Sequence, residues 1–137
     1  MDTLVTNENA MYPVSFSSDE TGQFEIYLKK YPDTGEKWLV SDEGGSEPRW
    51  SKDGKLLFYR NGNRIMRVPI TGRKNLDYGK AELVFEGPYP KSPFDITNYD
   101  ISHDRSKFLM LQPVSTGNQE INIIVNWFDE MKNLMKD

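Results

Sequence analysis

The single histidine, His103, is the first residue whose type and setting suggest chemistry, because Asp100 and Asp104 lie close to it in the chain. An imidazole held by a carboxylate serves as the base of a Ser-His-Asp triad when it also reaches a serine. In many hydrolases that serine lies in a Gly-x-Ser-x-Gly turn, and the Gly-Ser-Glu sequence at 45–47 does not match it. We therefore interpret His103 as a solvated turn histidine and assign no catalytic residue.

Acidic residues are the next candidates, as pairs at 19–20 and 42–43. A metal ion needs several converging oxygen ligands, and neither pair has the spacing of a calcium loop. We therefore expect solvated loops, no metal site and no cofactor. The absence of cysteine excludes a thiolate zinc site and a cysteine nucleophile. Carboxylates that converge only in the folded chain could still support a hydrolase or lyase reaction, such as glycoside cleavage, and this alternative stays open.

The charge of the chain bears on its partners and its location. A net charge of −4 and a pI near 5.1 oppose binding to a phosphate backbone, so no nucleic acid is expected. Residues 1–8 lack the basic and apolar regions of a signal peptide, and no window reaches transmembrane length. If the chain is complete, we expect a cytoplasmic protein of one domain with no membrane contact.

The chain consists mostly of short predicted strands, which must position any catalytic or binding side chains. Residues 47–60 show the clearest strand pattern. They predict a strand, a turn at Asp53-Gly54 and a second strand, because Gly accepts positive φ and Asp bonds to the local backbone. Leu56–Tyr59 is apolar on both faces, so this hairpin belongs between two other layers. Aromatic residues in the strand patterns are expected in the core; they are Trp38, Trp50, Phe58, Tyr59 and Phe108.

The hairpin pattern returns along the chain. Tyr99–Arg105 precedes an apolar run as Arg49–Gly54 does, and Ser51 and Ser102 are 51 residues apart. Ser17 is a weaker echo, 34 residues before Ser51. Repeats of short strands with such a period indicate propeller blades.

These residues resemble the TolB-type, WD40-like β-propeller repeats, whose motif Pro-x-Trp-Ser-x-Asp-Gly-Lys-x-Leu-Phe-Tyr is matched by Pro48, Trp50, Ser51, Asp53, Gly54, Lys55, Leu57, Phe58 and Tyr59. From residue 16 onward the chain is similar to the C-terminal half of propellers attached to bacterial serine/threonine kinases, at Ser18–Gly22, Glu47–Trp50, Phe85–Pro88, Asn98–Asp100 and Asn126–Phe128. In the third repeat, His103-Asp104-Arg105 replaces the family's Pro-Asp-Gly, so its turn is less clearly specified. Kinase motifs do not occur, so kinase activity is not implied.

The resemblance implies an all-β fold of about three antiparallel β-propeller blades, which is half of a six-bladed propeller. The single domain, residues 1–137, would comprise blades at about 10–42, 43–87 and 95–126. A short C-terminal α-helix is predicted at 127–136, folded back on its own sheet, because apolar residues form one helical stripe: Trp127, Phe128, Met131, Leu134 and Met135.

In a propeller the innermost strands line a channel, which places a candidate ligand site at its mouth. The polar residues expected there are Glu47, Arg49, Asn98 and Asp100. The favoured function is a non-catalytic binding or scaffolding module for a protein or small-molecule ligand. Two alternatives remain: a hydrolase or lyase with a carboxylate-based site in the channel, and a fragment of the sensor propeller of a kinase-linked protein.

Half a propeller would expose apolar blade faces and unpaired strand edges. We therefore expect a homo-oligomer, as a two-fold dimer that completes six blades. Leu4–Thr6 of one chain could supply the strand missing from the third blade of the other.

Overall fold

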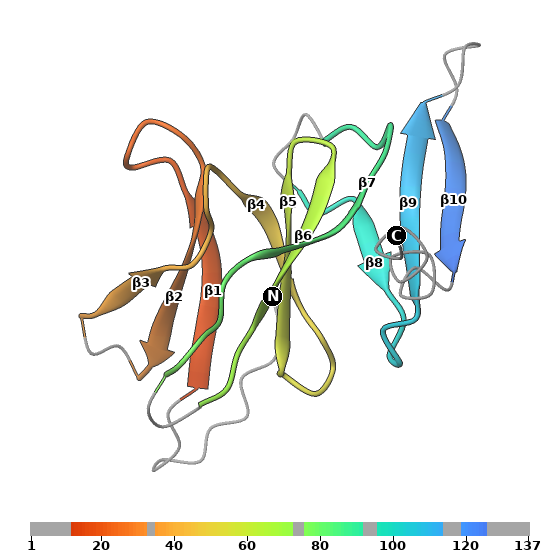
Figure 1. Cartoon of the computed structure of the whole chain (residues 1–137). Coiled ribbons are helices and arrows are strands. Elements are labelled where there is room, and N and C mark those ends of the chain that lie inside the picture. The colour runs from red at the N-terminus through yellow and green to blue at the C-terminus, as the bar shows by residue number, and fades with distance from the viewer. Residues whose placement is uncertain (1–11, 33–34, 73–75, 92–95, 114–118, 126–137) are drawn as a thin grey trace, which may run out of the picture.

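Ten strands in three antiparallel sheets make up the computed structural model, which describes residues 12–32, 35–72, 76–91, 96–113 and 119–125 (Figure 1). The first sheet contains β1 (Tyr12–Ser18), β2 (Glu25–Tyr31) and β3 (Lys37–Leu39). The middle sheet contains β4 (Ser46–Trp50), β5 (Leu56–Asn61), β6 (Arg64–Pro69) and β7 (Glu82–Glu86). The third sheet contains β8 (Tyr99–Ile101), β9 (Lys107–Pro113) and β10 (Gln119–Val125). The described residues form no helix, so the all-β class is confirmed.

Within every sheet, each strand pairs with the next strand in the sequence. The tight β5–β6 turn follows from Asn61-Gly62-Asn63, where Gly62 takes a φ of 62°. The sheets lie side by side in chain order, and β1 lies next to β4 (Figure 1). The predicted helix at 127–136 and the predicted strand at 4–6 lie outside the described residues.

The middle sheet is covered on both faces, as its two apolar sides predict. We call the side of a sheet that faces the sheet before it in the chain its preceding face, and the other side its following face. One core joins the following face of the first sheet to the preceding face of the middle sheet, through Ile26, Leu28, Val40, Leu57, Tyr59, Val68 and Ile70. A second core joins the following face of the middle sheet to the preceding face of the third, through Phe58, Ile65, Val84, Tyr99, Phe108 and Met110.

The expected core aromatics divide into two groups. Phe58, Tyr59 and Phe108 are fully buried, as predicted. Trp38 and Trp50 are only partly buried, and Trp50 packs against the margin of the first core. The difference arises because Trp38 lies on β3 and Trp50 lies on β4, which are edge strands of their sheets. The adjacent sheet covers such edges incompletely.

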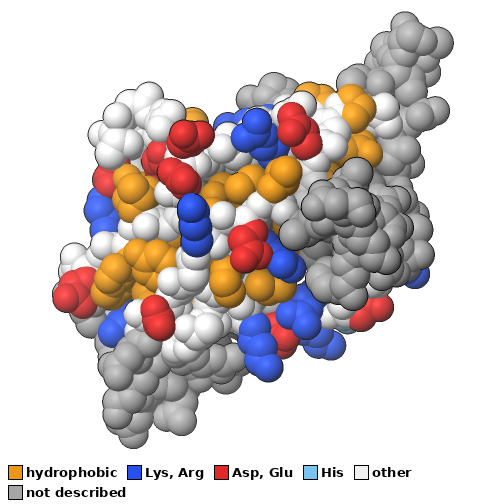
Figure 2. Space-filling view, viewed as in Figure 1, with side chains coloured by type: hydrophobic (Ala, Val, Ile, Leu, Met, Phe, Trp, Pro, Cys, Tyr) orange, Lys and Arg blue, Asp and Glu red, His pale blue; other side chains and the backbone are white. Residues whose placement is uncertain are grey.

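Charged side chains of both signs are interspersed with apolar ones on the face shown in Figure 2. Ion pairs also join β6 to β7, namely Arg64–Glu86 and Arg67–Glu82. The part of the chain that the structure describes contains no helix of the length and apolar character needed to cross a membrane.

The turns that follow β4 and β8 have the same hydrogen bonds. Ser51 Oγ donates to Asp53 Oδ1 at 2.7 Å, and the Leu56 amide donates to Ser51 Oγ at 3.0 Å. Ser102 Oγ and Asp104 Oδ1 are 2.6 Å apart in the third sheet, and the Lys107 amide donates to Ser102 Oγ at 3.0 Å. The turn after β8 is therefore as regular as the turn after β4, although the sequence of the third repeat specified it less clearly.

The two turns differ in the residue that adopts the left-handed conformation. Gly54 has a φ of 71°, and Arg105 holds the equivalent place with a φ of 63°. The Gly54 amide donates to the Ser51 carbonyl oxygen at 3.0 Å, and the Arg105 amide donates to the Ser102 carbonyl oxygen at 2.9 Å, so the backbone of the turn is the same with either residue.

Substitution of Gly54 by alanine is expected to lower the free energy of unfolding by about 1 kcal/mol or more, because a Cβ is disfavoured at positive φ. Urea denaturation followed by circular dichroism measures the change. Lys52→Ala, in the same turn and exposed, should stay within about 0.5 kcal/mol of the parent. Equal stability of Gly54→Ala and the parent would show that this turn carries no conformational strain.

The turn after β8 also predicts a dependence of stability on acid. Hydrogen bonds from the Ser102 and Ser106 hydroxyls and from the Ser106 amide hold the pKa of Asp104 well below its usual range. A carboxyl whose pKa is lowered on folding stabilises the fold above its unfolded pKa, about 3.9. That contribution is lost as the pH falls from there toward the lower folded pKa.

Asp104→Asn should therefore be less stable than the parent at pH 7 and should lose less stability between about pH 4 and pH 2. Thermal melts across this range test the difference in slope. Asp19→Asn, at an exposed loop carboxylate outside this turn, is the matched control for removal of one negative charge. Parallel curves for Asp104→Asn and the parent would refute a stabilising role of the ionised Asp104.

Candidate functional site

The four predicted site residues lie on, or directly before, the first strands of the middle and third sheets. Glu47 and Arg49 belong to β4, Asp100 belongs to β8, and Asn98 directly precedes β8. The backbone amide of Asn98 donates to Glu47 Oε1 at 2.8 Å, and Arg49 Nη2 donates to Asp100 Oδ1 at 2.8 Å. The structure therefore brings the four together as two pairs. Within each pair the residues are 51 positions apart, the same spacing as Ser51 and Ser102.

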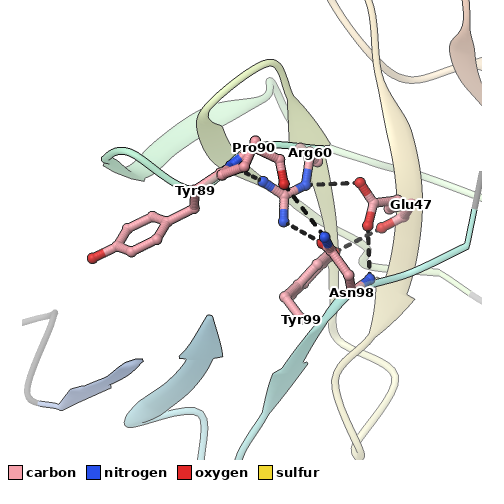
Figure 3. A network of polar contacts seen from close by, with 6 residues as sticks. All are labelled: Glu47, Arg60, Tyr89, Pro90, Asn98 and Tyr99. Carbon is pink, nitrogen blue, oxygen red and sulfur yellow. Dashed lines mark hydrogen bonds and ion pairs between the residues drawn. The ribbon is translucent and has the colours of Figure 1, made fainter. Parts of the chain in front are cut away.

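Glu47 is buried because the backbone bends at its position. It has a φ of 53°, in the left-handed region, and the pairing of β4 with β5 shifts between Ser46 and Arg49. Such an irregularity re-aims a side chain. Here the carboxylate points away from solvent toward the start of the third sheet (Figure 3), and its side chain is 1% exposed.

Arg60 completes the site and was not predicted. It ends the apolar part of β5, and its side chain is also 1% exposed. Its Nε lies 2.7 Å from Glu47 Oε2 as an ion pair, and its Nη2 donates to Asn98 Oδ1 at 2.7 Å. Its Nη1 donates to the Tyr89 carbonyl oxygen (Figure 3). Strand alternation gave a usable signal, because Arg60 lies on the same face as Phe58 and therefore faces the third sheet.

Tyr99 closes the network from the third sheet. Its hydroxyl donates to the Glu47 carbonyl oxygen at 2.7 Å, and its ring lies 5.6 Å from the guanidinium carbon of Arg60. Burial, together with the neighbouring Glu47 carboxylate, raises the pKa of Tyr99 far above its usual value. Tyr99 is therefore a neutral hydrogen-bond donor at neutral pH.

This network, which we call the inter-sheet network, consists of Glu47, Arg60, Asn98, Tyr99 and the backbone carbonyls of Tyr89 and Pro90. A buried charge is tolerated only when it is paired and hydrogen-bonded, and here the two opposite charges neutralise each other. The network connects the middle sheet to the third sheet. Its geometry supports a structural role for Glu47 and Asn98, since both face protein partners.

Arg49 and Asp100 differ because they remain accessible. Their side chains are 42% and 59% exposed although they pair with each other. A second pair, Arg105 and Asp53 at 3.5 Å, joins the turn after β8 to the turn after β4. We call Arg49, Asp53, Asp100 and Arg105 the rim. An exposed pair is held weakly, so a ligand could replace either partner at little cost.

The other candidates for chemistry do not converge. His103 is exposed in its turn. Among the residues that the structure describes, no group of three or more His, Asp or Glu side chains is placed to hold a metal ion. Comparison with models of protein families, with curated proteins and with solved structures finds no match.

Proposed function

We propose that the chain is a non-catalytic binding module made of consecutive TolB-like, WD40-like β-propeller blades, and that it binds its partner through the rim. The observation that carries the proposal is the contact between equivalent positions of the second and third repeats. Glu47 contacts Asn98 and Arg49 contacts Asp100, each across the repeat spacing of 51 residues.

Contacts between equivalent positions indicate that one repeat is rotated onto the next about an axis near those positions. Blades of a propeller are arranged in this way, with their first strands around a central channel. Three further observations support the arrangement: the sheets share one strand order, each sheet packs face to face on the next, and β1 lies beside β4.

Binding, rather than catalysis, is supported by the state of the polar groups. Glu47 and Arg60 pair with each other in the inter-sheet network and are each 1% exposed, so neither side chain is accessible to a substrate. The rim instead presents two accessible guanidinium groups, each paired with an accessible carboxylate. Arginine forms bidentate hydrogen bonds with carboxylates, so a protein or small molecule that carries both a carboxylate and a cationic group fits this surface.

The test is affinity capture from a lysate of the source cells with the immobilised chain. The parent should retain a discrete partner, and Arg49→Ala should retain at least about tenfold less, as expected for loss of a charged contact. Arg64→Ala is the matched control, because Arg64 also forms an exposed ion pair, with Glu86, but lies outside the rim.

Equal capture by all three proteins would refute binding through the rim. Cleavage of glycoside substrates by the parent, abolished when Asp100 is changed to Asn, would favour the hydrolase or lyase alternative.

A further inference from the structure

Two sheet faces are not covered by another described sheet. They are the preceding face of the first sheet and the following face of the third sheet, at opposite ends of the row of sheets (Figure 1). Both carry apolar residues that are exposed: Leu39 on β3 is 50% exposed, and Leu109 on β9 is 39% exposed. Singly exposed apolar residues are normal, but apolar residues that adjoin one another on a sheet face mark a contact surface.

The residues of these faces follow from the strand register. On the first sheet, Tyr27 pairs with both Phe16 and Leu39, which places all three on the preceding face. On the third sheet, Leu109 and Leu111 alternate with the core residues Phe108 and Met110, so they occupy the following face. The backbone register continues this face onto β10, because Ile123 pairs with Leu109 and Ile121 with Leu111.

The two open faces are of opposite kinds. At each of the two junctions within the chain, a following face packs on a preceding face. The first sheet therefore has an open preceding face, and the third sheet has an open following face. The third sheet of one copy matches the first sheet of another copy in the same sense in which consecutive sheets of one chain match.

We propose that these two faces join two copies of the 137-residue chain head to tail, so that the third sheet of each copy packs on the first sheet of the other. The inference rests on the proposed blade arrangement. Closed propellers typically have about 4 to 8 blades, and with three sheets in each copy only two copies give a blade number in that range. The dimer then contains six junctions of one type, of which two lie between copies, and no sheet face of this kind stays open.

Multi-angle light scattering at micromolar concentration tests the mass. The parent should give about 32 kDa, twice the chain mass of 15.9 kDa. Leu109→Lys and Leu39→Glu should each raise the dimer dissociation constant by about 100-fold or more, because each substitution puts a charge into both junctions between copies. Ile96→Lys is the control, since Ile96 is 60% exposed but lies in the segment before β8, outside both faces.

Mixing the two weakened variants tests the head-to-tail geometry. In the mixed dimer, Leu109→Lys and Leu39→Glu fall in the same junction, and the other junction has the parental residues. The mixture should therefore dimerise at least about tenfold more tightly than either variant alone. Both positions are exposed, so thermal melts should show folded proteins.

Several results would overturn the inference. A parent of monomer mass at micromolar concentration, or a trimer, refutes the dimer; a monomer that still loses its partner on Arg49→Ala would leave the proposed function intact. Dissociation by Leu109→Lys with no effect of Leu39→Glu would show third-sheet faces packed on each other instead. Lack of rescue in the mixture would refute the head-to-tail arrangement.

Discussion

Replacement of Arg60 by methionine is expected to lower the free energy of unfolding by about 3–5 kcal/mol. Methionine retains much of the side-chain volume but removes the charge that neutralises Glu47, which stays buried with its carboxylate 2.7 Å from the former position of Nε. An uncompensated buried charge is strongly destabilising, whereas the intact pair contributes little net stability. Urea denaturation at a fixed protein concentration measures the loss.

Two further variants separate this effect from loss of packing. The double variant Glu47→Leu, Arg60→Met removes both charges and should be more stable than Arg60→Met alone. Arg64→Met, at an exposed arginine on β6, should change stability by no more than about 0.5 kcal/mol. A double variant that is less stable than Arg60→Met would show that Glu47 is not left uncompensated in the single variant.

Phe58→Ala is expected to cost about 3–5 kcal/mol of unfolding free energy, through the cavity it leaves in the second core. Phe58 is fully buried, and its ring packs edge-on against Phe108, with centroids 5.3 Å apart. Chemical denaturation gives the loss directly. Phe58→Leu fills most of the space and should cost less than about 1.5 kcal/mol.

Trp50→Ala gives the contrast within the same hairpin. Trp50 is only partly buried at the margin of the first core, so its replacement should cost less than that of Phe58 although tryptophan is larger. If Trp50→Ala proved the more costly of the two, the first core rather than the second would dominate the stability of the middle sheet.

Local patterns were enough to predict the strands and the layers. Leu56–Tyr59 is apolar throughout. Because successive side chains of a strand point to opposite faces, both faces of this strand are apolar and each requires a covering layer. Both layers are present, because this inference depends only on neighbouring residues. The turn after Ser102 shows the opposite case, since its sequence lacks glycine and yet Ser102 and Asp104 form the same hydrogen bonds as the turn after Ser51.

The candidate site was predicted less completely because it depends on how two sheets meet. Sequence analysis singled out Glu47 and Asn98, but the burial of Glu47 results from a backbone bend and from its ion pair with Arg60, and Asn98 also binds Arg60. Arg60 lies 38 residues from Asn98, and no local pattern relates the two. Only the packing of the third sheet on the middle sheet brings Asn98 to the Arg60 guanidinium, which is why reasoning about neighbours in the sequence missed this contact.

The middle sheet belongs to both cores, while each outer sheet rests on one. Such an arrangement makes the order of opening unequal along the chain. Within a single copy, either outer sheet opens at the expense of one core, whereas separation of β5 from β6 requires the loss of both. In a dissociated copy we therefore expect amide hydrogens in β5 and β6 to be the last to exchange with solvent, with the middle repeat as the cooperative unit on which the flanking repeats fold.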